Sequence, residues 1–502
     1  MAARSGMEEV ELVEHDADPA DPVDHVERAR GAVRERARAV LHWLSGHRVL
    51  AAATVGAVVV AVAVPAALSA RSERARTAAL TELPGVLAPL ASAPQVAWTA
   101  PPTQGSYALT APDHAWVRDG VLVMWEQTGD ATSSLRALDA RTGDEAWTAP
   151  LSSVPDLGDP EDRITEDPTT CVAPASGDGG GVVVCLVADS WALTGAEDDT
   201  EPELVEAATV RLRGFDAATG ETVLDLPVER HVSFAPVGTD LVLVSPPEPG
   251  DGPARLVRLD PATRSERWSV DVARPSAGAG AVYPSVRLLE DEIGVRWLGT
   301  TALFTADGEA AGELDSDNVW ELRGNRVTLE GGGATGGQLR DLDTGRVLVV
   351  DGHPTWLATD DLTVPDVLVL ESVDRLTGRH LSTGQRAWQV DWPTESTQNL
   401  VVVDGMLARQ ADDGLTVIDL ATGDQLWRRS VSAAGNSMVT DGRRLLVIES
   451  VVGTGLVVAA YDARDGRRVW EAPLRVAVQD LAVVDNRLFA VGVDGVVSFG
   501  AD

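Results

Sequence analysis

One short phrase recurs through the chain from residue 139 onward, and it limits the possible folds more than any other feature. In its full form an apolar strand ends on aspartate, glycine follows four residues later, and a large apolar residue follows four residues after the glycine. Asp139, Gly143 and Trp147 form one such copy. Self-similarity of this kind indicates a repeat architecture, in which each unit buries its faces by stacking on its neighbours.

Clear copies stand at five positions and weaker ones at three. The clear copies contain Asp139, Gly143 and Trp147; Asp216, Gly220 and Leu224; Asp260 and Trp268; Asp419, Gly423 and Trp427; and Asp462, Gly466 and Trp470. The weaker copies begin at residues 304, 341 and 380, and the last has histidine in place of aspartate, followed by Gly384 and Trp388. The spacings of 77, 44, 44, 37, 39, 39 and 43 residues mostly match a four-stranded propeller blade of roughly 40 residues.

The residue types of the phrase have a structural explanation. An aspartate such as Asp139 can accept hydrogen bonds from the amides of the turn that follows it. The glycine supplies the positive φ that the turn requires. A tryptophan ring on the next strand can fill the gap between neighbouring sheets. We therefore expect the phrase to build the fold, not to carry chemistry.

The two ends of the repeat region look complementary. Residues 96–99 resemble an isolated strand with its tryptophan, and residues 494–499 resemble the strand that precedes the repeated turn. One sheet made from both ends would close a ring and bring the signatures to nine. Because propellers usually have four to eight blades, we expect an all-β, eight-bladed propeller, with seven to nine blades possible.

The charge and the cysteines of the chain narrow its possible partners. The 502 residues carry a formal net charge of −36 at pH 7, and phosphate binding needs clustered cations, so we expect no nucleic-acid partner. The two cysteines, Cys171 and Cys185, form no zinc-binding pattern. Outside the cytoplasm they would pair as a disulfide, either stapling a long insertion or bridging a recognition loop.

Residues 49–70 form a run of 22 residues without a charge, bounded by Arg48 and Arg71. A helix needs about 20 apolar residues to cross the hydrocarbon core, so the run predicts a transmembrane helix. Arginine is more frequent before the run than after it, which places the N-terminus in the cytoplasm and the repeats outside it at the cell membrane. The alternative is a cleaved signal peptide, for which residues 67–70 offer a small-residue cleavage site.

The rest of the chain divides around this run. Residues 1–48 are an acidic segment followed by an arginine-rich one, and we expect a disordered cytoplasmic tail. Residues 71–94 contain several prolines and predict a stalk or linker. Residues 95–502 are the predicted propeller, with an insertion at about 152–205.

The copies beginning at Asp139, Asp419 and Asp462 resemble the pyrroloquinoline-quinone (PQQ) repeat, an apolar strand followed by Asp-Ala-x-Thr-Gly-x-x-x-Trp. The resemblance covers about residues 94–502 and is loose between 273 and 350. It implies a propeller like that of quinoprotein alcohol dehydrogenases. The same repeat also occurs in non-enzymatic proteins, including a scaffold lipoprotein of outer-membrane assembly, so the fold does not decide the function.

The family's enzymes would require a calcium site, a carboxylate base and a stacking platform for the quinone. They commonly carry adjacent cysteines, whereas Cys171 and Cys185 are 14 residues apart. No residue matches the enzymes' cofactor residues, so we assign no catalytic, cofactor-binding or metal residue and expect neither PQQ nor calcium. An acidic loop at residues 198–203 is interpreted as a solvated charge run.

The sequence therefore favours a non-catalytic, extracytoplasmic propeller that binds a protein or cell-envelope partner and is anchored by one membrane helix. Two alternatives remain open: a PQQ-dependent dehydrogenase, and a ligand-binding sensor with a signalling tail. The partner, the binding face and the oligomeric state are not determined by the sequence.

Overall fold

A computed structural model describes most of the chain from residue 85 onward. The residues described are 71, 75–76, 79–80, 83, 85–101 and 115–500, with gaps at 128–132, 153–162, 165–169, 175–180, 189–191, 195–202, 206–208, 230–231, 247–251, 275–282, 290–291, 298, 317–318, 323–325, 331–336, 343, 351, 356, 373, 393–398, 412–413 and 493–494. The chain divides into two compact units, 1–76 and 77–502. The predicted tail and membrane helix, residues 1–48 and 49–70, lie outside the described residues. Within the described part no helix is long and apolar enough to cross a membrane.

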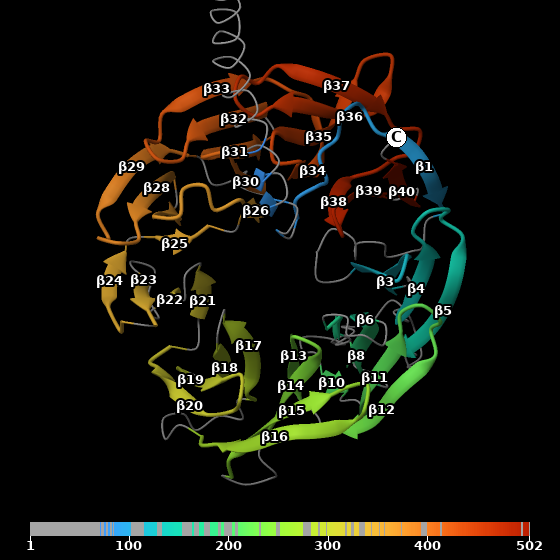
Figure 1. The fold of residues 1–502 in the computed structure, drawn as a ribbon, viewed down its shortest axis with the longest axis vertical. Coiled ribbons are helices and arrows are strands. Elements are labelled where there is room, and N and C mark those ends of the chain that lie inside the picture. Colours follow the sequence, from blue (N-terminus) through green and yellow to red (C-terminus); the bar gives the residue numbers. More distant parts are fainter. Residues whose placement is uncertain are drawn as a thin grey trace, which may run out of the picture. The chain divides into compact units, whose positions relative to one another are not determined.

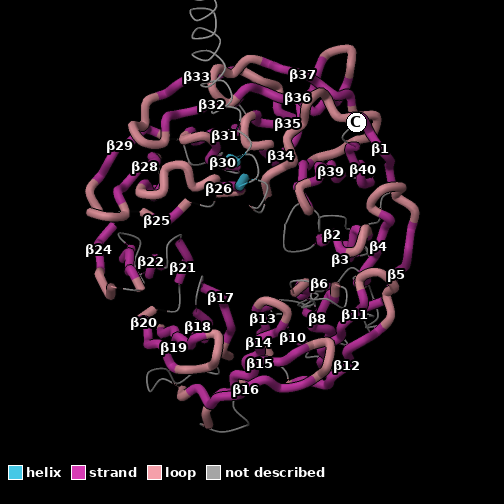
Figure 2. The backbone as a smooth tube through the Cα atoms, viewed as in Figure 1, coloured by secondary structure: helices cyan, strands magenta, loops and turns pink. Residues whose placement is uncertain are grey.

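The second unit is a ring of sheets whose strands pair antiparallel, except that β26 pairs parallel with β30 (Figures 1 and 2). We number the sheets 1 to 9 in ring order and give the strands of each from the innermost to the outermost. Sheet 1 is β2 (Ala115–Arg118), β3 (Val121–Gln127), β4 (Ser133–Asp139) and β5 (Glu145–Ser152); sheet 2 is β7 (Thr170–Val172), β8 (Val182–Ala188), β11 (Val210–Asp216) and β12 (Thr222–Val228); sheet 3 is β13 (Ser233–Val237), β14 (Asp240–Ser245), β15 (Ala254–Asp260) and β16 (Ser265–Val272); sheet 4 is β17 (Ser285–Leu289), β18 (Glu292–Trp297), β19 (Thr300–Thr305) and β20 (Ala310–Leu314).

The remaining sheets complete the ring. Sheet 5 is β21 (Val319–Leu322), β22 (Arg326–Glu330), β23 (Gly337–Asp341) and β24 (Val347–Val350); sheet 6 is β25 (His353–Pro354), β27 (Val367–Ser372), β28 (Arg375–His380) and β29 (Arg386–Asp391); sheet 7 is β26 (Thr359–Asp360), β30 (Asn399–Val403), β31 (Met406–Ala411), β32 (Gly414–Asp419) and β33 (Gln425–Arg429); sheet 8 is β34 (Ala433–Thr440), β35 (Arg444–Val451), β36 (Gly455–Asp462) and β37 (Arg468–Pro473); sheet 9 is β38 (Asp480–Val484), β39 (Arg487–Gly492), β40 (Gly495–Gly500) and β1 (Gln95–Ala100). A small extra sheet joins β6 (Arg163–Ile164), β9 (Ala192–Thr194) and β10 (Glu203–Val205).

The ring closes through the two ends of the repeat region, as the sequence predicts. Strand β1 pairs antiparallel with β40, which puts the first and the last strand of the unit side by side in sheet 9. Sheet 9 then packs against sheet 1 in one buried cluster that contains Trp98, Leu122 and Phe489. Similar clusters fill the junctions around the ring, because middle strands such as β14 and β31 are buried on both of their faces.

The expected number of eight blades is corrected by the sheet count. Nine sheets of four or five strands are present among the described residues, and each sequence signature has a sheet of its own. The weak copy near residue 304 is real, and it belongs to sheet 4. Its turn begins one residue later than the sequence suggests, at Thr305. The usual range of blade numbers was therefore a poorer guide than the spacing of the copies.

The predicted insertion at 152–205 is also corrected. Strands β7 and β8 fall inside this range, and they are the two inner strands of sheet 2. Only the segments around the small sheet β6–β9–β10 are additions to the repeat. These two strands were not expected from the sequence, because they lack the aspartate–glycine phrase and lie within the long spacing of 77 residues.

The last part of the predicted linker, residues 85–93, belongs to the second unit and packs on its sheets, and we refer to it as the strap. Val86 forms a parallel bridge with Thr440 at the end of β34, and the Leu87 N–H donates to the Thr440 carbonyl at 2.8 Å. The Val86 and Leu87 side chains are each 1% exposed. The Leu90 carbonyl accepts a hydrogen bond from Arg444. Apolar burial thus makes the strap part of the folded unit, where its prolines had predicted a free stalk.

Candidate interaction site

The repeated turn lies between the third and the fourth strand of a sheet and is held by its aspartate. In sheet 1, Asp139 Oδ1 accepts hydrogen bonds from the backbone N–H groups of Arg141 at 2.8 Å and Thr142 at 2.9 Å. These bonds are the main cause of the pKa of Asp139 lying below its ordinary value of 3.8. The Gly143 N–H donates to the Asp139 carbonyl at 2.8 Å, and Gly143 has a φ of 77°. The aspartates that accept two turn amides in the same way are Asp216, Asp260 and Asp419.

A tryptophan from the fourth strand of one sheet is seated on the repeated turn of the next sheet, and we use the word dock for this pairing. Trp98 of sheet 9 donates its indole N–H to the Ala140 carbonyl of sheet 1 at 3.1 Å. A Cβ added at Gly143 would stand 2.6 Å from the Trp98 ring, so the dock requires glycine for its lack of a side chain as well as for its φ. The other docks join Trp147 to Ala217 and Gly220, Trp268 to Ala306 and Gly308, Trp388 to Leu420 and Gly423, and Trp427 to Ala463 and Gly466.

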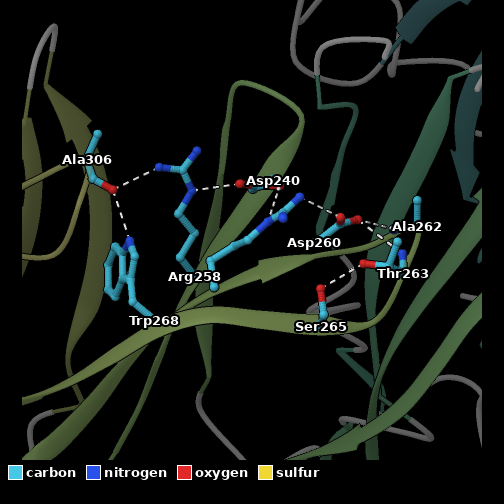
Figure 3. A network of polar contacts seen from close by, with 9 residues as sticks. Asp240, Arg258, Asp260, Ala262, Thr263, Ser265, Trp268 and Ala306 are labelled. Atoms are coloured by element: carbon cyan, nitrogen blue, oxygen red, sulfur yellow. Dashed lines mark hydrogen bonds and ion pairs between the residues drawn. The ribbon is translucent and has the colours of Figure 1, made fainter. Parts of the chain in front are cut away.

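Figure 3 shows the dock between sheets 3 and 4. The Ala306 carbonyl accepts one hydrogen bond from the Trp268 indole N–H at 3.0 Å and one from the Arg258 guanidinium at 2.8 Å. The same guanidinium pairs with Asp240 at 2.8 Å. Asp240 and Arg258 lie on strands of sheet 3, so this network joins two of its strands to the turn of sheet 4. A dock therefore fixes the neighbouring sheet by directional bonds as well as by apolar contact.

The junction between sheets 2 and 3 lacks both partners of a dock. Leu224 stands at the tryptophan position of sheet 2, and Arg264 stands at the glycine position of sheet 3 with a φ of 60°. The Arg264 guanidinium reaches back to the Val223 carbonyl, with its two nitrogens at 2.7 and 3.2 Å. Where no ring covers the turn, a side chain at the glycine position has room, and here it bonds to the neighbouring sheet instead.

In sheet 6 the turn carboxylate comes from a different part of the chain. His380 occupies the aspartate position, and its Nδ1 lies 3.0 Å from Asp366 Oδ2. The Ser382 N–H donates to Asp366 Oδ1 at 2.8 Å. Burial raises the pKa of Asp366, but the hydrogen bonds from Ser382 and His380 outweigh burial and leave the pKa lowered. The repeat phrase gave no signal for Asp366, because this residue precedes β27 and is remote from the phrase.

Among the described residues, one repeated turn has no covering side chain. In sheet 5 the turn is formed, since the Thr344 N–H donates to Asp341 Oδ1 at 2.8 Å and the Gly345 N–H to the Asp341 carbonyl at 2.9 Å. On the preceding sheet, however, Gly312 occupies the tryptophan position, where it pairs with Leu303 just before the bulge. A Cβ added at Gly345 would meet nothing within 4 Å, in contrast to the docked glycines.

The tryptophan of sheet 8, conversely, does not face a turn made by one continuous stretch of chain. Trp470 belongs to sheet 8, and the next sheet in the ring is sheet 9, in which the third and the fourth strand come from the two ends of the repeat region. The Trp470 indole N–H is buried and has no hydrogen-bond partner in the described part of the chain. The register of β1 and β40 puts Gly500 at the aspartate position, so Ala501, outside the described residues, follows at the acceptor position.

The two cysteines lie in strands, not in a loop. Cys171 of β7 and Cys185 of β8 are directly opposite each other and are joined by a disulfide with an S–S distance of 2.11 Å. Both side chains belong to the buried cluster between sheets 1 and 2. The predicted disulfide is therefore present, but the alternative of a bridged recognition loop on the propeller face is wrong, because the bridge ties two neighbouring blade strands.

Metal-binding side chains and adjacent cysteines are the features that a quinoprotein cofactor site would need. Among them, no group of three or more His, Cys, Asp or Glu side chains could hold a metal ion. The disulfide is buried between two sheets and joins residues 14 apart, which differs from the adjacent cysteines of the quinone enzymes. The acidic loop at 198–203 lies outside the described residues except for Glu203, the first residue of β10.

Antiparallel sheets joined in a ring by aspartate–glycine turns and docking tryptophans are similar to the blades of PQQ-like β-propeller repeat proteins. The family model described as outer membrane protein assembly factor BamB matches residues 301–448 and 411–501. No curated protein matches the chain.

Solved structures give matches of low identity. BamB from Moraxella catarrhalis is 19% identical, with 67% of this chain and 97% of that chain covered and a TM-score of 0.36. The computationally designed Ika8 protein is 14% identical, with 84% and 100% covered and a TM-score of 0.32. KlHsv2 with its loop 6CD replaced by a Gly-Ser linker is 12% identical, with 51% and 86% covered and a TM-score of 0.30.

Proposed function

We propose that this chain is a non-catalytic propeller that binds protein partners outside the cytoplasm and is held at the cell membrane by one helix, residues 49–70. The observation that carries the proposal is the use of the repeated residues. The carboxylate of Asp139 accepts the amides of its own turn, and Trp147 is seated on the next sheet. Because these groups hold the ring together, they leave its outer strands and loops as the surface for recognition.

A protein partner is supported by the matched family. Its description names an outer membrane protein assembly factor, and we carry over only the coarse role of a protein-interaction module. The Cys171–Cys185 disulfide supports an extracytoplasmic location, since such bridges persist in oxidising compartments. The excess of arginine before residue 49 supports a cytoplasmic N-terminus.

Proximity labelling tests this function. A labelling enzyme fused after Asp502 in the full-length chain is expected to mark a reproducible set of extracytoplasmic proteins. A variant without residues 1–48 is the matched control, and it is expected to mark the same set. Loss of the set in this variant would favour a sensor with a signalling tail, and the absence of any reproducible neighbour would contradict the scaffold role.

Two further measurements separate the alternatives. Reporter fusions at Asp502 are expected to report an extracytoplasmic C-terminus, and a cytoplasmic signal would overturn the proposed topology. Addition of PQQ and calcium to the purified full-length chain is expected to give no dye-linked alcohol oxidation. Oxidation that depends on both additions would favour the dehydrogenase.

A further inference from the structure

We propose that the uncovered turn Asp341–Gly345 is a docking site for a tryptophan side chain of a partner protein, presented on an extended segment. The inference rests on the proposed protein-binding function and assigns a place and a chemistry to it. The chain itself shows what fits such a turn, because five other copies are each covered by a tryptophan of the preceding sheet.

The geometry of the site matches that of the occupied docks. The turn has its hydrogen bonds from Thr344 and Gly345 to Asp341, and Gly345 has a φ of 69°, within ten degrees of the 77° at Gly143. The carbonyl that receives the indole N–H in a dock belongs to the residue after the aspartate, and here that residue is Leu342. A leucine stands at the same position in the occupied dock of Trp388.

The other turns with unusual sequences are covered in other ways. At Gly384 of sheet 6, Leu348 takes the tryptophan position and contacts the glycine, with its Cδ1 3.3 Å from an added Cβ. In the turn of sheet 3, the Arg264 guanidinium donates hydrogen bonds to the Val223 carbonyl of sheet 2. Among the repeated turns that the structure describes, the one ending at Gly345 therefore differs in having open space above its glycine.

The strand beside the uncovered turn is apolar where its equivalents are polar. Leu348 and Val350 of β24 pack toward sheet 6, so the alternation of a strand turns Val347 and Val349 toward the side of sheet 4. Val347 is 47% exposed and Val349 is 74% exposed. The residues that correspond to Val349 on the other outer strands are Thr99, Thr148, Asp225, Ser269, Glu313, Gln389, Arg428 and Glu471. Val347 and Val349 follow the uncovered turn on the same strand, so they offer exposed apolar surface for contact with a partner segment.

The partner segment is expected to present tryptophan in place of the missing side chain of sheet 4. Gly312 lies on β20, at the position from which a docking ring would reach Gly345. Since Gly312 has no side chain and is exposed, it leaves space for an outside ring to enter. Tryptophan suits such a site because its large apolar surface is combined with one hydrogen-bond donor.

Titration with a peptide tests the site in the full-length chain. The probe is an acetylated and amidated peptide with the chain's own residues 265–272, in which the tryptophan is 5-fluorotryptophan, observed by fluorine NMR. The wild-type chain is expected to bind it with saturation, and the peptide with alanine in place of tryptophan is expected to bind at least about tenfold more weakly, a difference of about 1.4 kcal/mol. Equal binding of the two peptides would overturn the assignment of tryptophan.

Substitution of the turn glycine provides the matched test. In Gly345→Asn the new Cβ occupies the space of the ring, since in the docks this atom would lie 2.6 to 2.9 Å from a tryptophan. Asparagine tolerates positive φ, so the turn is expected to stay folded. Gly299→Asn is the control, because Gly299 also has a positive φ and nothing within 4 Å but belongs to the β18–β19 turn. We expect at least tenfold weaker peptide binding in the first variant and no change in the second.

Proximity labelling with the same two variants separates this site from the general function. If Gly345→Asn loses a neighbour that the wild-type chain and Gly299→Asn both mark, the site and the function are both supported. If all three mark the same neighbours, partner binding stands and the proposed site is wrong. If light scattering shows a dimer of the full-length chain that Gly345→Asn abolishes, the occupant is a second copy and the proposal of a different partner protein is overturned.

Discussion

The dock between sheets 6 and 7 and the uncovered turn of sheet 5 show two uses of one structural element. In the first, Trp388 is 6% exposed, donates to the Leu420 carbonyl at 2.6 Å and lies on Gly423. In the second, the turn is formed by the same bonds, yet Gly312 leaves it open. The turn therefore has its hydrogen bonds both with and without a tryptophan above it, and the tryptophan adds a contact between two sheets.

The comparison distinguishes contacts that stabilise a single sheet from contacts that stabilise the interface between two sheets. The hydrogen bonds of Asp341 act within one sheet, and they form whether or not a ring is present. The ring of Trp388 acts between two sheets, in a cluster with residues of β27, β30 and β31. Among the described residues, five junctions of the ring have a tryptophan dock and the others do not, so the ring closes without a dock at every junction.

The largest expected effect is the removal of a docked ring. Trp388→Ala creates a cavity in the cluster between sheets 6 and 7 and leaves the Leu420 carbonyl without its donor. We expect a loss of roughly 3–5 kcal/mol in the free energy of unfolding, measured by denaturant titration of the full-length chain. A loss below about 1 kcal/mol would show that docks add little to the junctions.

A pair of glycine substitutions compares the covered and uncovered turns directly. In Gly423→Ala the new Cβ would stand 2.7 Å from Trp388, whereas in Gly345→Ala it would meet nothing within 4 Å. Both carry the strain of a positive φ, about 1–2 kcal/mol, and the first adds an overpacking cost of about 1–3 kcal/mol. Equal losses in urea unfolding would contradict the view that the tryptophan is the reason for glycine in the dock.

The sequence predicted the parts of the fold that local chemistry determines. The aspartate bonds and the positive φ of Gly143 follow from the turn phrase alone, and the pairing of β1 with β40 follows from its two incomplete halves. The turn on which each tryptophan docks could not be predicted in the same way. A dock joins residues 32 to 70 positions apart, as in Trp388 with Leu420 and Trp147 with Ala217, and one sequence does not show which turn faces which ring.

Contacts made across the chain account for the errors as well. The strap was read as a linker because its prolines are visible in the sequence, while its partner Thr440 is more than 350 residues away from Val86. Asp366 was missed because the carboxylate that serves the turn of sheet 6 lies outside the phrase. The sequence does contain a signal for the uncovered turn, because glycine stands at residue 312 where tryptophan is usual. This signal can be interpreted only once the structure shows which turn faces residue 312.

A smaller effect is expected from the charge of a turn aspartate. The pKa of Asp139 is lowered in the folded chain by the amides of Arg141 and Thr142, so its carboxylate stabilises the fold above its ordinary pKa of 3.8. This contribution is expected to be lost as the pH falls through the lowered pKa. In Asp139→Asn the unfolding midpoint should therefore depend less on pH between 6 and 3 than in the wild-type chain. An unchanged pH dependence in the variant would contradict a role of the charge.

The smallest expected effect on stability belongs to the valine beside the uncovered turn. Val349→Thr gives β24 the kind of polar residue that the equivalent positions carry, such as Thr148 of sheet 1. Because the side chain is 74% exposed, we expect a change within about 0.5 kcal/mol in the free energy of unfolding. Binding of the fluorinated peptide should nevertheless weaken several-fold, since the valine contributes apolar contact at the rim. A stability loss above about 2 kcal/mol would mean that Val349 serves the fold, and the contrast between covered and uncovered turns would then lose its functional interpretation.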